Sequence, residues 1–314
     1  MAYAAGKPRP PLALIAGPTV SGKSDLAVRL ALRAEERGRR AVIVNADSAQ
    51  VYADLAVLSA RPTAEEMQGI EHRLFGAWDG ATACSAADWA AAARREVEAV
   101  QAKGGLPILV GGTGLYIRTL LEGIAPVPEI DADVRRTVRA LPGADAYTAL
   151  SREDPARAAL LSPNDSARVA RALEVVRSTG RTLAQWQERR VGGIADRVDL
   201  RPLILLPDRA ALYARCDARF ARMLGEGAIA EVEALLARGL DPALPVMRAI
   251  GVPEIAAYLR GDSSLEEACA RGAQATRNYA KRQFTWFRRQ PPPTWPHLTP
   301  NDVVQDSIIE TLLQ

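Results

Sequence analysis

The residues best suited to chemistry form a short glycine-containing loop near the start of the sequence. They are Gly17, Pro18, Thr19, Val20, Ser21, Gly22, Lys23 and Ser24. The loop follows an apolar run and precedes a helical pattern, which is the context of a phosphate-binding loop, where backbone N–H groups surround an anion. Lys23 would supply a charge for phosphate oxygens, and the Ser24 hydroxyl would be a ligand for Mg²⁺. The loop therefore predicts a diphosphate or triphosphate ligand, although it does not establish hydrolysis.

Two further polar segments follow apolar runs. Asp47 and Ser48 come after Ala41–Val44, and Thr113 lies in a glycine-rich turn after Pro107–Val110. Because the carboxyl ends of parallel strands meet at one edge, we expect these side chains to share a crevice with the phosphate-binding loop. Asp47 could bind Mg²⁺ through water or accept a proton. Two simpler alternatives stay open, a cap for the following turn at Asp47 and a plain strand-to-helix turn around Thr113.

The order of apolar and helical patterns indicates the architecture that must position these residues. Four short apolar runs alternate with helix-like stretches, which predicts an α/β fold with a P-loop NTPase-like parallel sheet flanked by helices. An Ala- and Arg-rich stretch without strand-like runs predicts a helical insertion domain over 124–200, within a core formed by 1–123 and 201–314. Helices are expected over 210–238, 252–260 and 264–290, and then a last helix capped by Asn301 or Asp302.

Composition excludes several classes of protein. The 314 residues are 48% hydrophobic and 25% charged with a net charge of +3, which suits a globular protein and gives only weak support for a nucleic-acid partner. No apolar run is long enough for a membrane span, and the first residues do not resemble a secretory signal. Three separated cysteines and two histidines argue against a disulfide framework, a structural zinc site and a multi-histidine metal site. A cytoplasmic location fits this usage.

Two segments concentrate positive charge. From Arg271 to Arg289 the chain has six cations, no acid and several interleaved aromatic residues, so one helical face, including Lys281 and Arg282, could meet phosphates. The segment Asn164–Arg190 carries six arginines against three acids. In both cases the alternative is an ordinary solvated helix face with salt bridges.

Several ordered motifs resemble one known family. GPTVSGKS, NADSAQVY, HRL, SAADW, LVGGTGLYIRTLLEG, SPNDSARVARALEV and AKRQFTWFRR, which span about 12–289, look like those of the bacterial tRNA dimethylallyltransferases, also called tRNA isopentenyltransferases. The resemblance implies transfer of a dimethylallyl group from dimethylallyl diphosphate to N6 of the adenosine at tRNA position 37, which yields N6-dimethylallyladenosine and diphosphate. It also implies that the phosphate-binding loop holds the prenyl diphosphate together with Mg²⁺.

The resemblance assigns roles to individual residues. Asp47 corresponds to the general base, Thr113 to a residue of the reaction channel, and Lys23 and Arg219 to contacts with the diphosphate. The positions expected to contact the tRNA anticodon stem-loop, some through the resemblance and some through the basic helix, are Asp47, Ser48, Ala49, Gln50, Thr113, Arg135, Ala167, Arg168, Val169, Ala170, Arg171, Arg248, Gly251, Lys281 and Arg282. Val252 and Pro253 depart from the family, which usually has an aromatic and a basic residue there. The chain also has no Cys/His zinc module after Arg289, as in the shorter bacterial form.

Two other functions share the phosphate-binding loop. A P-loop kinase for a small metabolite would use the helical insertion as a lid, and a nucleotide-gated RNA-binding factor would perform no chemistry on a base. Neither explains the full set of ordered motifs. We expect a monomer, and the sequence does not specify which tRNAs are modified or the metal ligands.

Overall fold

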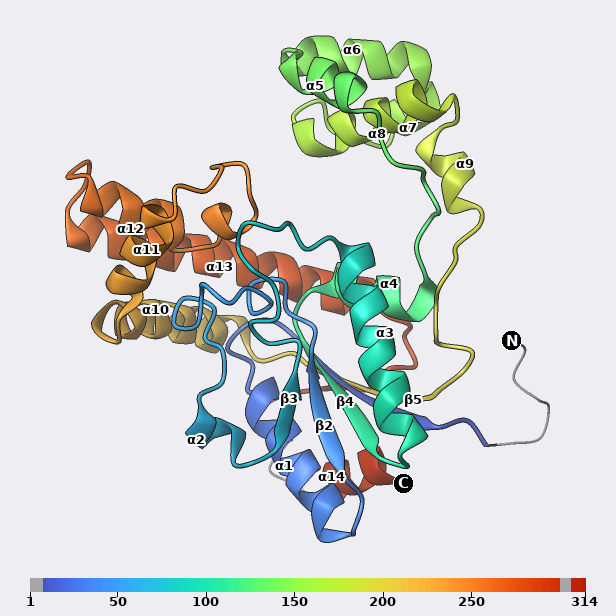
Figure 1. Ribbon diagram of the computed structural model, residues 1–314, viewed down its shortest axis with the longest axis vertical. Coiled ribbons are helices and arrows are strands. Elements are labelled where there is room, and N and C mark those ends of the chain that lie inside the picture. The colour runs from blue at the N-terminus through green and yellow to red at the C-terminus, as the bar shows by residue number, and fades with distance from the viewer. Residues whose placement is uncertain (1–7, 300–305) are drawn as a thin grey trace. The chain divides into compact units, whose positions relative to one another are not determined.

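The computed structural model describes residues 8–299 and 306–314 and has a six-stranded, wholly parallel sheet at its centre (Figure 1). The strand order is β3-β2-β4-β1-β5-β6. The strands are β1 (Pro11–Ala16), β2 (Ala41–Asn45), β3 (Glu71–Arg73), β4 (Leu106–Gly111), β5 (Asp199–Leu205) and β6 (His297–Leu298). The prediction of a parallel α/β sheet is therefore confirmed. The sequence pattern missed β3 and β6, which have three and two residues and lie at the two edges of the sheet.

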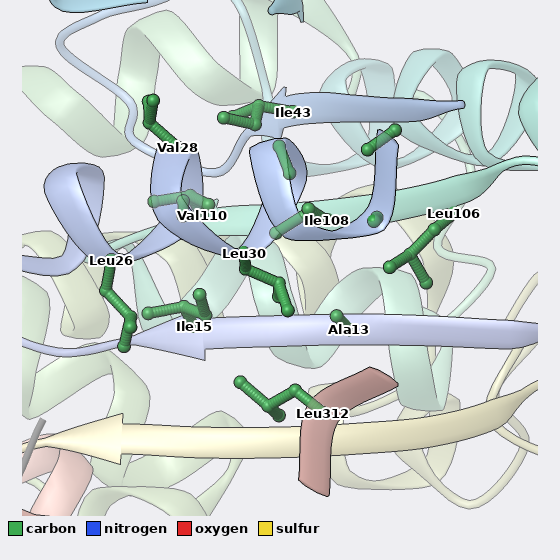
Figure 2. Close-up of a cluster of buried hydrophobic side chains, with 14 of the residues drawn as sticks. Ala13, Ile15, Leu26, Val28, Leu30, Ile43, Leu106, Ile108, Val110 and Leu312 are labelled. Carbon is green, nitrogen blue, oxygen red and sulfur yellow. The ribbon is translucent and has the colours of Figure 1, made fainter. Parts of the chain in front are cut away.

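The central strands are buried on both faces, as their continuous apolar runs predict. Ala13 and Ile15 of β1 face α1 (Lys23–Glu36) and the C-terminal helix α14 (Asp306–Leu313). Figure 2 shows this cluster, in which Leu30 of α1 and Leu312 of α14 lie against the sheet. On the other side of the sheet, α3 (Ala86–Ala102) packs against β2 and β4. These layers hold the carboxyl ends of β1, β2 and β4 in a fixed arrangement.

The helices after β5 differ in one respect from the sequence prediction. The segment 210–238, expected as a single helix, forms α10 (Arg209–Gly225) and α11 (Ala228–Ala237). Gly227 separates them with a φ of +106°, a left-handed conformation that glycine adopts without the steric penalty of a side chain. The following helices are η1 (Val246–Arg248), α12 (Val252–Leu259) and α13 (Leu265–Arg289). The break lets α10 pack along α13 while α11 contacts α12.

The chain divides into two compact units, of which the larger contains the sheet. This unit comprises residues 8–120, 194–299 and 306–314 of the described chain, and the smaller one is Leu121–Gly193. The smaller unit has its own core, in which Leu150, Val169 and Leu173 are completely buried. Its helices are α5 (Ala132–Ala140), α6 (Gly143–Glu153), α7 (Pro155–Ala158), α8 (Ser166–Thr179) and α9 (Leu183–Gln187). The remaining helices are α2 (Ala64–Met67), in the larger unit, and α4 (Gly114–Glu122), which runs from the larger unit into the smaller.

Among the described residues, no helix is both long and apolar enough to cross a membrane. The predicted caps of the last helix, Asn301 and Asp302, lie outside the described residues.

Candidate active site

Three loops meet where β1, β2 and β4 end, and backbone hydrogen bonds connect them. The Gly17 N–H donates to Gly111 O at 3.4 Å, and the Thr113 N–H donates to Ala46 O at 3.1 Å. A Cβ on Gly111 would lie 2.2 Å from the Ala46 carbonyl group, so only glycine allows the ends of β2 and β4 to approach this closely. The structure thus brings the phosphate-binding loop, Asp47 and Thr113 to one edge of the sheet.

The loop Gly17–Ser24, hereafter the P-loop, surrounds a space suited to an anion. Gly22 precedes α1 in the left-handed region with a φ of +84°, which turns the loop into the helix. No described residue accepts a hydrogen bond from the backbone N–H groups of residues 20–24. The buried hydroxyl of Ser21 also has no partner in the described part of the chain. Several donors without a protein acceptor, at the start of a helix, fit a bound anion such as a diphosphate.

Two cations from separate segments reach the P-loop. Lys23 Nζ donates to Pro18 O at 3.2 Å, and Arg219 of α10 donates to Thr19 Oγ1 at 3.1 Å. Burial lowers the pKa of Lys23 to about 8, although Asp47 opposes the shift and Arg219 adds to it. Burial likewise lowers the pKa of Arg219, and its buried Nε has no partner among the described residues. Both side chains therefore carry charge that an anionic ligand would stabilise.

The P-loop and α10 enclose a cavity of about 440 Å³, hereafter the P-loop cavity. The Ser24 side chain is exposed there, and Arg215 and Arg222 add cations beside Arg219. His72 also lines the cavity, with its Nδ1 at 2.8 Å from Ile70 O. Burial lowers the pKa of this imidazole.

Asp47 is fixed just beyond the end of β2. Its backbone N–H donates to Asn45 Oδ1 at 2.8 Å, and the Asn45 side chain donates back to Asp47 O at 3.0 Å. Asp47 Oδ1 accepts from the Ala49 N–H at 2.9 Å, and the residue is only 9% exposed. The predicted local capping contact is thus present, yet the side chain also borders two cavities. The carboxylate is held rigidly at their junction.

A hydroxyl network lies beside Asp47. Thr113 Oγ1 accepts from the Ser48 N–H at 2.9 Å and lies 3.2 Å from Ser48 Oγ. Tyr279, from α13, lines the same cavity as Asp47 and Ser48. Burial raises the pKa of Tyr279, and the nearby charge of Asp47 adds to the shift, so this phenol stays protonated. The sequence identified Thr113 and Ser48, whereas Tyr279 was only one of the interleaved aromatic residues of the basic segment.

The second cavity next to Asp47, hereafter the apolar cavity, measures about 320 Å³. Its apolar walls come from segments far apart in the sequence, namely Leu55, Leu58, Phe220, Met223 and Ile250. Cys84 also lines it, beside the hydroxyls of Tyr52 and Tyr116. Met223 and Cys84 are both buried, and they also line this cavity. Arg248 and Arg282 complete the polar part of its lining.

One wall of the apolar cavity is fixed by an acid that no sequence motif indicates. Glu231, on α11, accepts hydrogen bonds from the N–H groups of Ala56, Val57 and Leu58 at 2.5, 2.9 and 2.9 Å. Three backbone donors on one carboxylate hold the loop before α2 in a single conformation. More than 170 residues separate the partners, so no local pattern could have revealed this contact.

The predicted tRNA-contacting residues lie in several places. In the smaller unit, Arg135, Ala167 and Arg168 are exposed, whereas Val169 is 0% exposed. Val169 faces the core of its helical unit, and the expected tRNA contact at this position stays a prediction. Ala170 is half-buried, and Arg171 Nη1 lies 3.9 Å from Oε2 of the buried Glu174.

In the larger unit, Gly251 is also buried, with a φ of +96°, and a Cβ there would lie 2.6 Å from Leu58 Cδ2. Val252 and Pro253 occupy the first turn of α12, where proline is tolerated. The departure from the family pattern thus leaves the start of this helix intact.

The basic face of α13 is smaller than its sequence suggests. Arg277 forms an ion pair with Asp217, and Arg271 lies 4.0 Å from Glu267. Lys281 is exposed, and the exposed Arg282 lies over the Tyr279 ring at 5.7 Å.

Ala49 and Gln50 line the apolar and P-loop cavities respectively. Among the described residues, no group of three or more His, Cys, Asp or Glu side chains could hold a metal ion.

The chain is similar to known proteins over nearly its whole length. Residues 50–290 match the family model described as IPP transferase. A tRNA dimethylallyltransferase of Erythrobacter litoralis is 63% identical over 306 residues, covering 98% of this chain and 96% of that protein. Its counterpart in Novosphingobium aromaticivorans is 65% identical over 279 residues, covering 89% and 99%.

Solved structures agree with this similarity. The tRNA isopentenylpyrophosphate transferase of Bacillus halodurans superposes with a TM-score of 0.68 at 31% identity, covering 96% of both chains. A eukaryotic dimethylallyltransferase described as acting on tRNA gives a TM-score of 0.79 at 26% identity, covering 95% of this chain and 76% of that one.

Proposed function

Since the chain belongs to the IPP transferase family, we propose that it transfers a dimethylallyl group from dimethylallyl diphosphate to N6 of the adenosine at tRNA position 37. The products are N6-dimethylallyladenosine and diphosphate. The names of the close relatives support this activity and not the alternative of a small-metabolite kinase.

The observation that carries the proposal is the junction of the two cavities. The P-loop cavity offers unpartnered backbone donors and cations, whereas the apolar cavity offers aliphatic and aromatic walls, and Asp47 borders both. A prenyl diphosphate has the same division, with a doubly charged head and a hydrocarbon chain. Its reacting carbon joins these two parts, so it would lie near Asp47.

Stabilisation of the leaving group is the main task of the P-loop. The bond from the allylic carbon to oxygen breaks readily because the cation that develops is delocalised. Negative charge then accumulates on the departing diphosphate, where preorganised donors contribute most. The backbone N–H groups of the loop, Lys23 and Arg219 surround that position.

Proton removal falls to Asp47. The exocyclic amine of adenine is a poor nucleophile, and its proton must leave as the new carbon–nitrogen bond forms. Asp47 is held by backbone hydrogen bonds beside Thr113 and Ser48, which are suited to orienting the base. The adenosine has to leave its stack to enter such a site, as in other enzymes that modify bases.

The donor set also suits Mg²⁺. Ser24 presents an exposed hydroxyl beside the P-loop, and the described residues contain no self-sufficient acidic cluster. Mg²⁺ commonly binds through one or two protein ligands together with substrate phosphate oxygens, which matches this arrangement. When bound, the metal would neutralise charge on the diphosphate.

For tRNA we propose contacts at the exposed cations, because phosphate contacts supply most of the affinity for nucleic acids. The exposed cations of the expected set are Arg135, Arg168, Arg171, Arg248, Lys281 and Arg282. Backbone atoms would have to make the contact at Val169 and at Gly251, whose surroundings leave no room for a side chain. The anticodon stem-loop is the expected substrate region.

We further propose that the protein acts as a monomer in the cytoplasm, where its tRNA substrate is available. Light scattering of the purified protein would reveal any stable dimer.

The activity is tested by incubating the protein with dimethylallyl diphosphate, Mg²⁺ and unmodified tRNA, followed by mass analysis of the nucleosides. The expected product is N6-dimethylallyladenosine at position 37. Turnover of ATP without tRNA would favour a kinase, and tight tRNA binding without modification would favour an RNA-binding factor.

A further inference from the structure

Gln283, on α13, has a buried side chain whose amide binds two separate loops. The residue is 5% exposed. Its Oε1 accepts a hydrogen bond from the Thr19 N–H at 2.8 Å, and its Nε2 donates to Gly112 O at 2.8 Å. Thr19 belongs to the P-loop and Gly112 follows β4, so one amide connects the ends of two neighbouring strands through a third element.

The two loops carry different halves of the proposed site. Thr19 accepts a hydrogen bond from Arg219 on the diphosphate side. Thr113, which follows Gly112, forms the hydroxyl network beside Asp47. Gln283 therefore adds a side-chain connection, beside the backbone hydrogen bond from Gly17 to Gly111, between the diphosphate contacts and the residues that would orient the base.

The packing around this amide leaves little freedom. A Cβ on Gly112 would lie 2.2 Å from Gln283 Nε2 and 2.9 Å from Gly17 O, so only glycine fits between the amide and the P-loop. A second glycine contact holds the same helix, because a Cβ on Gly114 would lie 2.4 Å from the Trp286 ring. These close approaches place α13 directly against the loops that follow β1 and β4.

We propose that Gln283 is a positioning residue, which holds the P-loop in register with the end of β4 so that the diphosphate and the adenine amine meet at the reacting carbon. This role rests on the proposed prenyl transfer. It adds a residue outside the phosphate-binding motif to the machinery, acting through Thr19 and Gly112 without touching the substrate. Misplacement of a reacting group by about 1 Å can reduce a rate by about 10²-fold, so a small shift of either loop would slow the reaction markedly.

The test compares Gln283→Met with the wild-type protein. Methionine fills a similar volume and removes both hydrogen bonds. We expect the KM for dimethylallyl diphosphate to rise about tenfold or more and kcat to fall by about 10-fold to 10²-fold. Binding of inorganic pyrophosphate, measured by calorimetry, should weaken in parallel, while the Kd for tRNA stays within about twofold. Gln274→Met is the matched control, because Gln274 is exposed on the same helix and bonds only to helix neighbours.

A second variant distinguishes the loss of the two hydrogen bonds from a general folding defect. Gln283→Asn keeps the amide but is one methylene too short to reach both loops, so it should repeat the weaker pyrophosphate binding with less change in volume. If either folded variant binds pyrophosphate within twofold of wild type and keeps its KM, the positioning role is wrong. Equal losses for pyrophosphate and tRNA would also overturn it, since they indicate a general structural effect.

The pyrophosphate measurement needs no turnover. A wild-type protein that forms no dimethylallyladenosine would refute the proposed function. The comparison of pyrophosphate affinities would still test whether Gln283 positions the P-loop.

Discussion

The two cavities beside Asp47 are built in different ways. The polar part of the P-loop cavity includes one continuous stretch, Thr19–Ser24, while α10 and the segments around Ile43 and Ser59 complete its lining. The apolar cavity draws most of its walls from six segments between Tyr52 and Arg282, none of which is recognisable alone. Binding of an anion can be specified by a few adjacent residues because backbone donors are always present. Binding of a hydrocarbon and a base requires a shaped surface, which only packing can provide.

In the proposed reaction, the P-loop cavity stabilises the charged diphosphate and the apolar cavity positions the hydrocarbon and the base. Asp47 borders both cavities. Variants that affect one cavity should therefore leave the properties of the other unchanged, and those at the junction should affect catalysis without affecting either ligand's affinity.

The largest effect is expected for Asp47→Ala. Loss of a general base should reduce kcat by about 10²–10⁴-fold, while the affinity for pyrophosphate changes little. Single-turnover assays with tRNA would measure this loss, with Glu233→Ala as a control at an exposed acid of α11. A kcat within threefold of wild type would remove Asp47 from this role.

Lys23→Met should produce the next largest effect and act through the P-loop cavity. Removal of one preorganised donor to the leaving group should lower kcat/KM for dimethylallyl diphosphate by about 10²–10³-fold. The Kd for tRNA should not change, which a filter-binding assay would show. Lys103→Met, at the exposed end of α3, is the matched control. Equal weakening of tRNA binding would contradict the separation of the two cavities.

The pH dependence of diphosphate binding should reflect the same lysine. The pKa of Lys23 is lowered to about 8, so the side chain is charged below this pH and increasingly neutral above it. The affinity of the free enzyme for pyrophosphate should therefore fall above about pH 8, by up to about tenfold for each pH unit. Lys23→Arg retains its charge and should show a flatter profile over this range, as calorimetry at several pH values can establish. Coincident profiles for the two proteins would refute the assignment.

The smallest effect is expected for Tyr279→Phe, which changes only the apolar cavity. Loss of one neutral hydroxyl from the cavity lining should reduce kcat by about 2–10-fold and leave the pyrophosphate affinity unchanged. Tyr258→Phe on α12 provides a control for a tyrosine outside both cavities. A changed affinity for pyrophosphate would show that the cavities are more strongly coupled than their separate linings indicate.

Much of the fold could be predicted because its signals are local. The apolar runs of β1, β2, β4 and β5 are typical of strands buried on both faces, and the P-loop sequence requires a strand before it and a helix after it. The two short edge strands were missed, since His297–Leu298 and Glu71–Arg73 carry too few apolar residues to form a pattern. The break at Gly227 was missed because the helical pattern continues on both sides.

The site was predictable to a different degree in its two parts. Asp47, Thr113 and the P-loop follow strands, and their proximity follows from the rule that parallel strands end at one edge. Glu231 and Tyr279 gave no such signal, because each acts on a segment more than 160 residues away in the chain. Val169 lies in a motif of the family, but it is on the same face of α8 as Ala172 and Leu173, which packs into the core.

The sequence by itself determined the anion-binding loop, the acid that follows the second strand and the parallel sheet that brings them together, because each depends on residues adjacent in the chain. The tertiary structure alone decided which side chains close the apolar cavity and how Gln283 connects the P-loop to β4. Those contacts depend on how α10, α11 and α13 pack against the ends of the strands, and packing is a property of surfaces that no short stretch of sequence contains.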